Sequence, residues 1–167
     1  MTAYDFAERL MAMDDATWRR HANPLSVQTR FTCLPLIVLA AWSYVWIGWW
    51  SLAPLGLALW WTWYNPRAFP EPQHFDSWWS RAVLGERVFL AHRQEVPFHH
   101  QRAANILSAM SVPGAILLVF GLLMQWAPGA GFGTVLVMLP KAWFCDRMVW
   151  LYDDWVREGR PVPGMET

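Results

Sequence analysis

Hydrophobic residues are concentrated in two long stretches of the chain, and neither stretch contains an acid, a base or a histidine. The first covers residues 31–64 and the second covers residues 103–140. A helix that crosses a membrane needs about 20 apolar residues, so each stretch is long enough for two crossings. Each also has a turn signal near its middle, rich in proline, glycine or serine, at residues 51–54 and 127–131. The pattern therefore predicts two transmembrane hairpins.

Each hairpin supplies two of the four predicted spans. These helices cover approximately residues 31–49, 52–64 and 103–126, with a fourth that begins at about residue 132. The fold class that we expect is an all-α integral membrane protein with four transmembrane helices.

Two further segments have apolar residues at helical spacing but also carry charges. In the first, apolar positions recur between residues 6 and 13, before Asn23 and Pro24 end the pattern. In the second, Asp76 is the expected N-cap of a helix that runs to His92. Helices with one apolar and one charged face lie along the membrane surface. We therefore expect one or two amphipathic helices on the cytoplasmic side.

Basic residues occur before, between and after the two hairpins, and both hairpin tips lack them. The positive-inside rule assigns such basic segments to the cytoplasm. We therefore expect a multi-pass protein of the inner membrane with both termini in the cytoplasm. The tryptophans near the tips fit an aromatic belt at the outer interface. They are Trp46, Trp49, Trp50 and Trp126.

With 167 residues, the chain has the length of a single domain. Its first thirty residues contain no long apolar run, so we expect no signal peptide. We divide this membrane domain into an N-terminal amphipathic segment, a first hairpin, a cytoplasmic interfacial segment, a second hairpin and a tail. They cover residues 1–30, 31–64, 65–102, 103–155 and 156–167.

The composition supports a membrane protein and argues against other classes. Hydrophobic residues make up 55% of the chain and charged residues only 16%, whereas soluble domains have about 25% charged residues. The formal net charge is zero, and no basic stripe exists that would favour nucleic-acid binding. Cys33 and Cys145 lie in apolar segments without the spacing of a metal or redox motif, so we expect both to be packing residues.

The fourth predicted helix carries charges at membrane depth. Counted from Phe132, Lys141 lies roughly 13–14 Å into the apolar layer, and Asp146 and Arg147 about 21–22 Å. A charge at such depth costs on the order of 3 kcal/mol, so it usually faces the protein interior and pairs. We expect a polar cavity in which Lys141 and Arg147 bind a ligand and Asp146 acts as a general acid or base. The alternatives are basic side chains that extend to the interface, or a structural clamp around Asp146.

Two other places support such a cavity. The second predicted helix covers only about 20 Å before Asn65 and Pro66, which is less than the thickness of the apolar layer. We expect Asn65 and Arg67 to face the cavity, unless this is merely a kinked helix end. Glu86 and Arg87 lie within the interfacial helix and would close the cavity from below, with Glu86 as a second candidate acid or base. The alternative is that they lie on a solvated helix face.

The histidines raise the question of a metal. His92, Glu95, His99 and His100 have spacings that suit one helix face, but Pro97 interrupts that helix. The paired histidines resemble those of membrane di-iron hydroxylases and desaturases, although the complete histidine boxes of those enzymes do not occur. We therefore expect surface histidines and no cofactor. If a metal binds at all, we expect it among these four residues.

Four strings in the chain are distinctive. They are HANPLSVQTRF, NPRAFPEP, RAVLGERVFL and KAWFCDRMVWLYDD, at residues 21–31, 65–72, 81–90 and 141–154. Together they resemble a family of small bacterial and archaeal membrane proteins of unknown function. The resemblance covers most of the chain. It implies the four-span architecture and brings no activity, substrate or catalytic residue.

Three functions are consistent with this pattern, and no phosphate-binding loop, dinucleotide fingerprint or nucleophile elbow adds a fourth. The first is an enzyme or binding protein for an amphiphile with an anionic head, which enters from the inner leaflet. The second is an accessory or assembly subunit of a membrane complex. The third is a transporter of small solutes, although the outer half of every predicted span lacks ionisable groups. The expected partners are membrane lipids and either further copies of the chain or a membrane subunit, but no nucleic acid.

Overall fold

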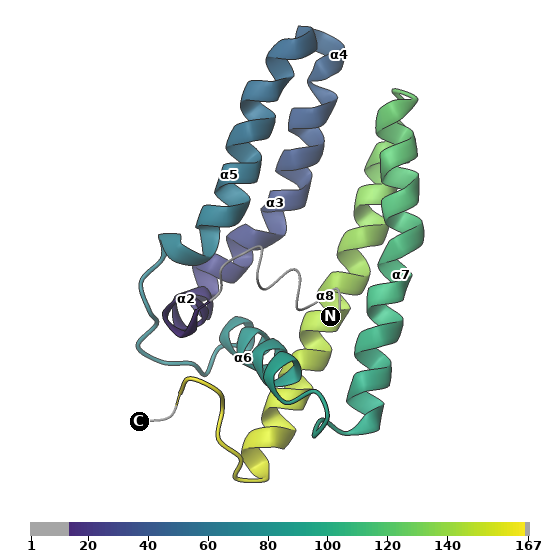
Figure 1. Cartoon of the computed structure of the whole chain (residues 1–167). Helices are drawn as coiled ribbons and strands as arrows, with labels where there is room; N and C mark the ends of the chain where they lie inside the picture. Colours follow the sequence, from purple (N-terminus) through teal and green to yellow (C-terminus); the bar gives the residue numbers. More distant parts are fainter. Residues whose placement is uncertain (1–13, 166–167) are drawn as a thin grey trace.

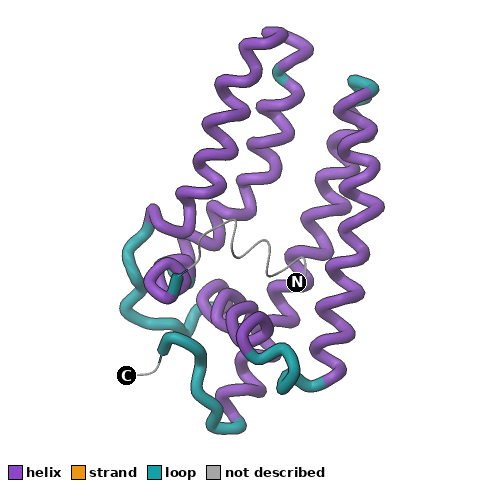
Figure 2. Tube along the Cα trace, viewed as in Figure 1, coloured by secondary structure: helices purple, strands orange, loops and turns teal. Residues whose placement is uncertain are grey.

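The computed structural model describes residues 14–165, and within that range every regular element is a helix (Figures 1 and 2). The apolar pattern predicted between residues 6 and 13 lies outside the described part. The elements are α2 (Asp15–His21), α3 (Pro24–Trp42), α4 (Tyr44–Ile47), the 3-10 helix η1 (Gly48–Ser51), α5 (Leu52–Ala68), α6 (Trp78–Ala91), α7 (Phe98–Leu123) and α8 (Ala127–Arg157). The all-α prediction is confirmed.

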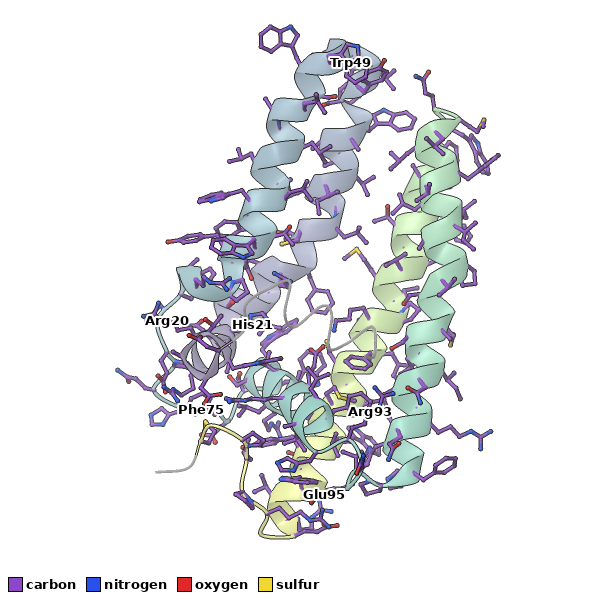
Figure 3. The ribbon with its side chains drawn as sticks, in the orientation of Figure 1. Arg20, His21, Trp49, Phe75, Arg93 and Glu95 are labelled. Atoms are coloured by element: carbon purple, nitrogen blue, oxygen red, sulfur yellow. The ribbon has the colours of Figure 1, made fainter. Side chains whose placement is uncertain are left out.

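The elements form two helical hairpins joined by a crossing helix (Figure 1). Helices α3 and α5 pair in the first hairpin, with α4 and η1 at its tip, and α7 and α8 pair in the second. Helix α6 lies across the base and packs on α8, while α2 packs on α5. Trp49 lies at the tip of the first hairpin, and Glu95 lies near the opposite end of the molecule (Figure 3).

The first hairpin begins earlier than its apolar pattern. Asn23 caps α3, since its side chain accepts a hydrogen bond from the Leu25 N–H at 3.0 Å, and Pro24 occupies the first turn, where a missing N–H has no cost. Helix α3 therefore includes Arg30, and it ends at Trp42 rather than at residue 49. The tip then turns through Gly48, whose φ of 56° is unfavourable for residues with a side chain.

The base of α5 differs from the irregular backbone that we expected there. Asn65, Pro66 and Arg67 are all helical, and α5 ends at Ala68. Pro66 has no N–H to donate to the carbonyl of Thr62, four residues earlier. The guanidinium of Arg30 on α3 donates to that carbonyl instead. A side chain of the neighbouring helix thus replaces the lost backbone hydrogen bond and allows α5 to continue.

Glycines permit the closest helix contacts in the second hairpin. A methyl group at Gly114 would clash with Leu136 on α8, and methyl groups at Gly121 and Gly133 would clash with the backbone of the facing helix. Small residues at such positions let two helix backbones approach each other, as in membrane helix pairs. The second hairpin is therefore packed closely along its length.

The largest apolar core lies at the base, around α6, rather than between the hairpins. Its central cluster joins α6, α7 and α8 and comprises Val88, Phe89, Val96, Ala104, Leu107, Phe144, Met148, Leu151 and Trp155. Along the hairpins, by contrast, many large apolar side chains are exposed. They include Leu39, Leu57, Trp60, Ile116 and Leu123.

Two helical stretches are long and apolar enough to cross a membrane, Pro24–Ala68 and Phe98–Leu123. Only 11% and 22% of their most apolar windows are buried, whereas the core helix of a soluble protein is mostly buried. The first stretch is the whole α3–α5 hairpin, which turns back on itself at α4 and η1. Helix α8 does not meet the same criterion, so the number of crossings stays a prediction.

Candidate functional site

Lys141, the only lysine in the sequence, lies in the middle of α8 and pairs with Glu86 on α6. Its Nζ is 3.2 Å from Glu86 Oε1 and 3.5 Å from Oε2. The same ammonium group lies 4.5 Å from the centre of the Phe144 ring, which is a favourable cation–π position. The Lys141 side chain is 50% exposed and that of Glu86 25%. The pair is therefore accessible and carries one charge of each sign.

A glycine contact holds α6 close enough for this pair. A methyl group at Gly85 would overlap the main-chain carbonyl of Met148 on α8, so only glycine permits this approach. Glu86 follows Gly85 directly, on the half-buried side of α6 next to α8. The fully buried side chains of Leu84 and Val88 fix the same turn of α6 in the core. The position of the Glu86 carboxylate thus follows from helix packing.

A second cation, Arg30 on α3, lies near the Lys141–Glu86 pair. Its guanidinium interacts electrostatically with the Glu86 carboxylate and with the Lys141 ammonium group. Glu86 of α6 pairs with Lys141 of α8, and Arg30 of α3 adds a second positive charge nearby, while its guanidinium donates to the Thr62 carbonyl. Sequence analysis did not single out Arg30. The available signal was an arginine next to the first apolar stretch, but its helix was expected to begin one residue later.

His21 does not contribute a third positive charge. Burial, together with the smaller effects of the nearby charges of Arg30 and Lys141, lowers the pKa of His21 to about 3. The ring is therefore neutral near pH 7, and its Nδ1 lies 2.9 Å from the hydroxyl of Ser26. Arg30, Lys141 and Glu86 thus leave a formal surplus of one positive charge at the base of the hairpins.

A cavity of about 250 Å³ lies beside Lys141, between α7 and α8. Its polar lining residues are Lys141, Ser108 and Ser111, and the Ser111 hydroxyl also lies 3.5 Å from the Leu107 carbonyl. The apolar lining consists of Leu107, Pro140 and Phe144. At about 30 Å³ for each molecule of liquid water, the volume suits a small polar head rather than a large one. A cation and two hydroxyls can all donate hydrogen bonds to an anion.

The structure gives Asn65 a different place from the one expected. It is fully buried between α3 and α5, where its Nδ2 donates to Thr29 Oγ1 at 2.7 Å. The Ser26 hydroxyl lies 3.4 Å from the Asn65 carbonyl and 3.5 Å from its Oδ1. His21 of α2, Ser26 and Thr29 of α3, and Asn65 of α5 form a partly buried polar network that joins the three helices. These partners, which sequence analysis missed, account for the polarity of Asn65 without a ligand.

Arg67 and Arg87 also have partners of their own. The Arg67 guanidinium lies 4.3 Å above the Trp63 ring and donates to the Trp63 carbonyl at 2.7 Å, so it turns back on α5. Arg87, only 7% exposed, forms an ion pair with Asp15 of α2. Its guanidinium also lies against Gly164 near the end of the described chain. Neither arginine lines the cavity beside Lys141.

Asp146 and Arg147 interact with each other rather than with Lys141. Arg147 donates to Asp146 Oδ2 at 3.2 Å and stacks over the Trp150 ring at 4.2 Å. At about 100° per residue, Asp146 and Arg147 point roughly 140° and 240° away from Lys141 around α8. The structure therefore brings together only Lys141 and Glu86 among the expected cavity residues. The carboxylate that pairs with Lys141 comes from α6.

The four residues considered for a metal divide into two groups. His92 Nδ1 lies 3.2 Å from Glu95 Oε1, in the loop region whose Arg93 and Glu95 are labelled in Figure 3. His99 and His100, at the start of α7, gather instead with Asp154 near the end of α8. Asp154 was one of the acids considered near the histidines, but it is not among the four residues, and 54 positions separate it from His100. Cys33 and Cys145 are both buried and unbonded, as expected.

Comparisons with known proteins identify the family of this chain, and that family has no known activity. A family model described as a family of unknown function (DUF6653) matches residues 5–164. No curated protein and no solved structure matches the chain. A function for this chain therefore has to be inferred from its own geometry.

Proposed function

The chain belongs to DUF6653, a family of unknown function, and from its own geometry we propose that it binds an amphiphile with an anionic head in the inner leaflet of a membrane. Lys141 and Arg30 attract the head, and the cavity beside Lys141 receives it. The hydrocarbon part lies along the apolar hairpins. The single observation that carries this proposal is an accessible lysine, unique in the chain, between one carboxylate and a small polar cavity.

Four membrane-spanning helices, α3, α5, α7 and α8, account for the apolar side chains that are exposed along the two hairpins. Monomeric soluble proteins rarely expose contiguous apolar patches of more than a few hundred Å², whereas lipid-facing helices do so along their whole length. The α3–α5 hairpin and α7 have this character. Helix α8 pairs with α7 along its length, so it crosses with it. Both tips then lie outside and the base with α6 lies at the cytoplasmic face, as the distribution of basic residues requires.

The depth of Lys141 agrees with this arrangement. Helix α8 begins at Ala127, so Lys141 lies about 21 Å along it rather than the 13–14 Å expected from a start at residue 132. In an apolar layer about 30 Å thick, this is the inner part. The 31 residues of α8 extend about 46 Å, so its end with Asp154 reaches beyond the layer. An amphiphile of the inner leaflet would bring its head to the level of Lys141.

The first hairpin offers a surface for the hydrocarbon part. An apolar groove of about 590 Å³ lies between α3 and α5. Its only polar side chain is that of Ser43, and its apolar lining includes Leu36, Leu39, Leu57 and Trp60. Such a lining favours a flexible acyl chain over a polar solute.

The experiment is a competition between lipids. Purified protein in mild detergent is given equal amounts of a phosphoglycerol lipid and a phosphocholine lipid with identical acyl chains, and retained lipid is counted by native mass spectrometry. We expect retention of the anionic lipid. Lys141→Gln should reduce it about tenfold, because a hydrogen bond to a charged group contributes about 1.5–3 kcal/mol. Arg102→Gln is the matched control, since it removes one positive charge from an exposed position on α7.

Labelling separates a lipid from a soluble anion. Lys141 is the only lysine, so amine modification followed by peptide mapping reports on it alone. Anionic lipid should protect it, and glycerol phosphate without acyl chains should protect it far less. Equal retention of both lipids, or equal losses in Lys141→Gln and Arg102→Gln, would contradict the proposal.

A further inference from the structure

His99 and His100, in the first turn of α7, direct their rings to one place. Neighbouring residues of a helix normally point about 100° apart. Here the ring centres are only 4.1 Å apart, at an angle of 41°. The Asp154 carboxylate of α8 lies at the same point, with Oδ2 3.1 Å from His100 Nε2. We infer that His99, His100 and Asp154 form a binding site for a divalent transition-metal ion of the Zn²⁺ class.

The distances suit a single ion. One donor atom from each of the three side chains lies within 4.8 Å of the other two. Tetrahedral ligands about 2.0–2.2 Å from zinc are roughly 3.3–3.6 Å apart, so the set closes around an ion with at most about 1.5 Å of movement. His99 is exposed and can make that movement, whereas His100 is only 4% exposed and fixed between α7 and α8.

The surroundings of Asp154 support its role as a ligand. Its Oδ1 accepts a hydrogen bond from Arg157 at 2.9 Å, which leaves Oδ2 directed at His100. Outer contacts of this kind hold a ligating carboxylate in one orientation. Two imidazoles and one carboxylate favour zinc and similar ions over magnesium or calcium, which prefer oxygen alone. On the side of the exposed His99, water completes the coordination, as at zinc sites with three protein ligands.

This site is separate from the proposed amphiphile site. Asp154 follows Lys141 by thirteen positions on α8, or about 20 Å along the helix axis. His92, which follows α6, lies outside the set and has its own partner in Glu95, at 3.2 Å. His92 therefore provides a matched control for histidine loss at the same end of the molecule.

The test uses the full chain, purified without a polyhistidine tag and stripped with a chelator. Zn²⁺ is titrated by calorimetry, and Co²⁺ by its visible absorption. We expect one Zn²⁺ per chain and at least a tenfold weaker affinity in His99→Ala and in Asp154→Asn, while His92→Ala binds like the wild type. His99 is exposed, so its variant should keep the helical circular dichroism of the wild type even where Asp154→Asn does not.

Three results would overturn the site. The first is a wild-type protein that takes up no Zn²⁺ at millimolar concentration. The second is a folded His99→Ala variant with unchanged affinity. The third is a His92→Ala variant that loses as much affinity as His99→Ala, which would move the ion to other ligands. Failure of the lipid competition leaves these outcomes unchanged, because the two experiments concern different residues.

Discussion

The ammonium group of Lys141 lies 3.2 Å from a carboxylate oxygen of Glu86, although 55 positions separate the two residues in the chain. The pair joins α8 to the crossing helix α6. Asp146 lies much nearer in sequence, but it pairs with Arg147 on another side of α8. Lys141 therefore depends for its partner on the contact between α6 and α8.

Removal of the Glu86 charge should strengthen the binding of an anionic amphiphile. The carboxylate competes with the ligand for Lys141, so Glu86→Gln frees the ammonium group. A partly exposed ion pair contributes about 0.2–1 kcal/mol, which corresponds to an increase in affinity of up to about fivefold. Lipid retention, counted by native mass spectrometry, measures this increase in affinity. Glu95→Gln, which changes an exposed carboxylate in the loop before α7, should have no effect. Weaker binding in Glu86→Gln would show that the carboxylate assists the ligand.

Gly85→Ala should destabilise the protein. The added methyl group overlaps the Met148 carbonyl, and such overpacking costs about 1–3 kcal/mol. Gly56→Ala on α5 is the matched control, because nothing lies within 4 Å of the added methyl group. In a helix interior that change is favourable by about 0.5–1 kcal/mol. Thermal unfolding in detergent should thus shift in opposite directions for the two variants, and equal shifts would disprove the close contact of α6 with α8.

Stability should fall below pH 6.5 because of His21. Its pKa is about 3 in the folded protein and ordinarily 6.5, so between these values the unfolded chain takes up a proton that the folded chain does not. The contribution is complete above pH 6.5 and is lost as the pH falls towards 3. At pH 5 the loss amounts to about 2 kcal/mol. His21→Gln should remove this dependence. Parallel unfolding curves for variant and wild type between pH 7 and pH 5 would contradict the prediction.

Asn65 should contribute to stability rather than to binding. Asn65→Ala leaves the buried hydroxyl of Ser26 and the half-buried hydroxyl of Thr29 without its side-chain amide, at a cost of about 1–3 kcal/mol. Thr29→Val should also destabilise, whereas Thr32→Val, at an exposed position one turn later, should change little. Chemical or thermal unfolding measures all three. A folded Asn65→Ala variant that loses only lipid retention would make Asn65 a binding residue.

If four helices span the membrane, a cysteine introduced at a hairpin tip and one introduced at the base lie on opposite sides of it. In a chain whose Cys33 and Cys145 are replaced by alanine, Trp50→Cys lies at the first tip and Gln94→Cys lies in the loop between α6 and α7. A membrane-impermeant maleimide added to intact bacterial cells should label the first position, and the second only after lysis. Labelling of Gln94→Cys in intact cells would reject the proposed orientation.

Much of the fold was predictable from local patterns. The all-helical fold and the break at Asn23 and Pro24 depend on nearby residues, which set backbone hydrogen bonding and apolar periodicity. The two chain reversals lie a few residues earlier than predicted, because residues 52–54 and 127–131 already belong to α5 and α8. The predicted ends were less accurate. Helix α3 includes Arg30 because capping, and not hydropathy, decides where a helix begins. Helix α5 passes Pro66 because a side chain of α3 supplies the missing donor, and no local pattern in α5 records that donor.

By itself, the sequence determined that the chain forms apolar hairpins with charged bases, and it marked Lys141 and Glu86 as unusual. Only the tertiary structure decided that these two pair, that Asn65 is enclosed by Ser26 and Thr29, and that His100 meets Asp154. The physical reason is the separation along the chain of the residues that interact. Helix formation and apolar periodicity arise from neighbours within a few residues. Hydrogen bonds and ion pairs require atoms within about 3–4 Å, and only the packing of distant helices brings those atoms together.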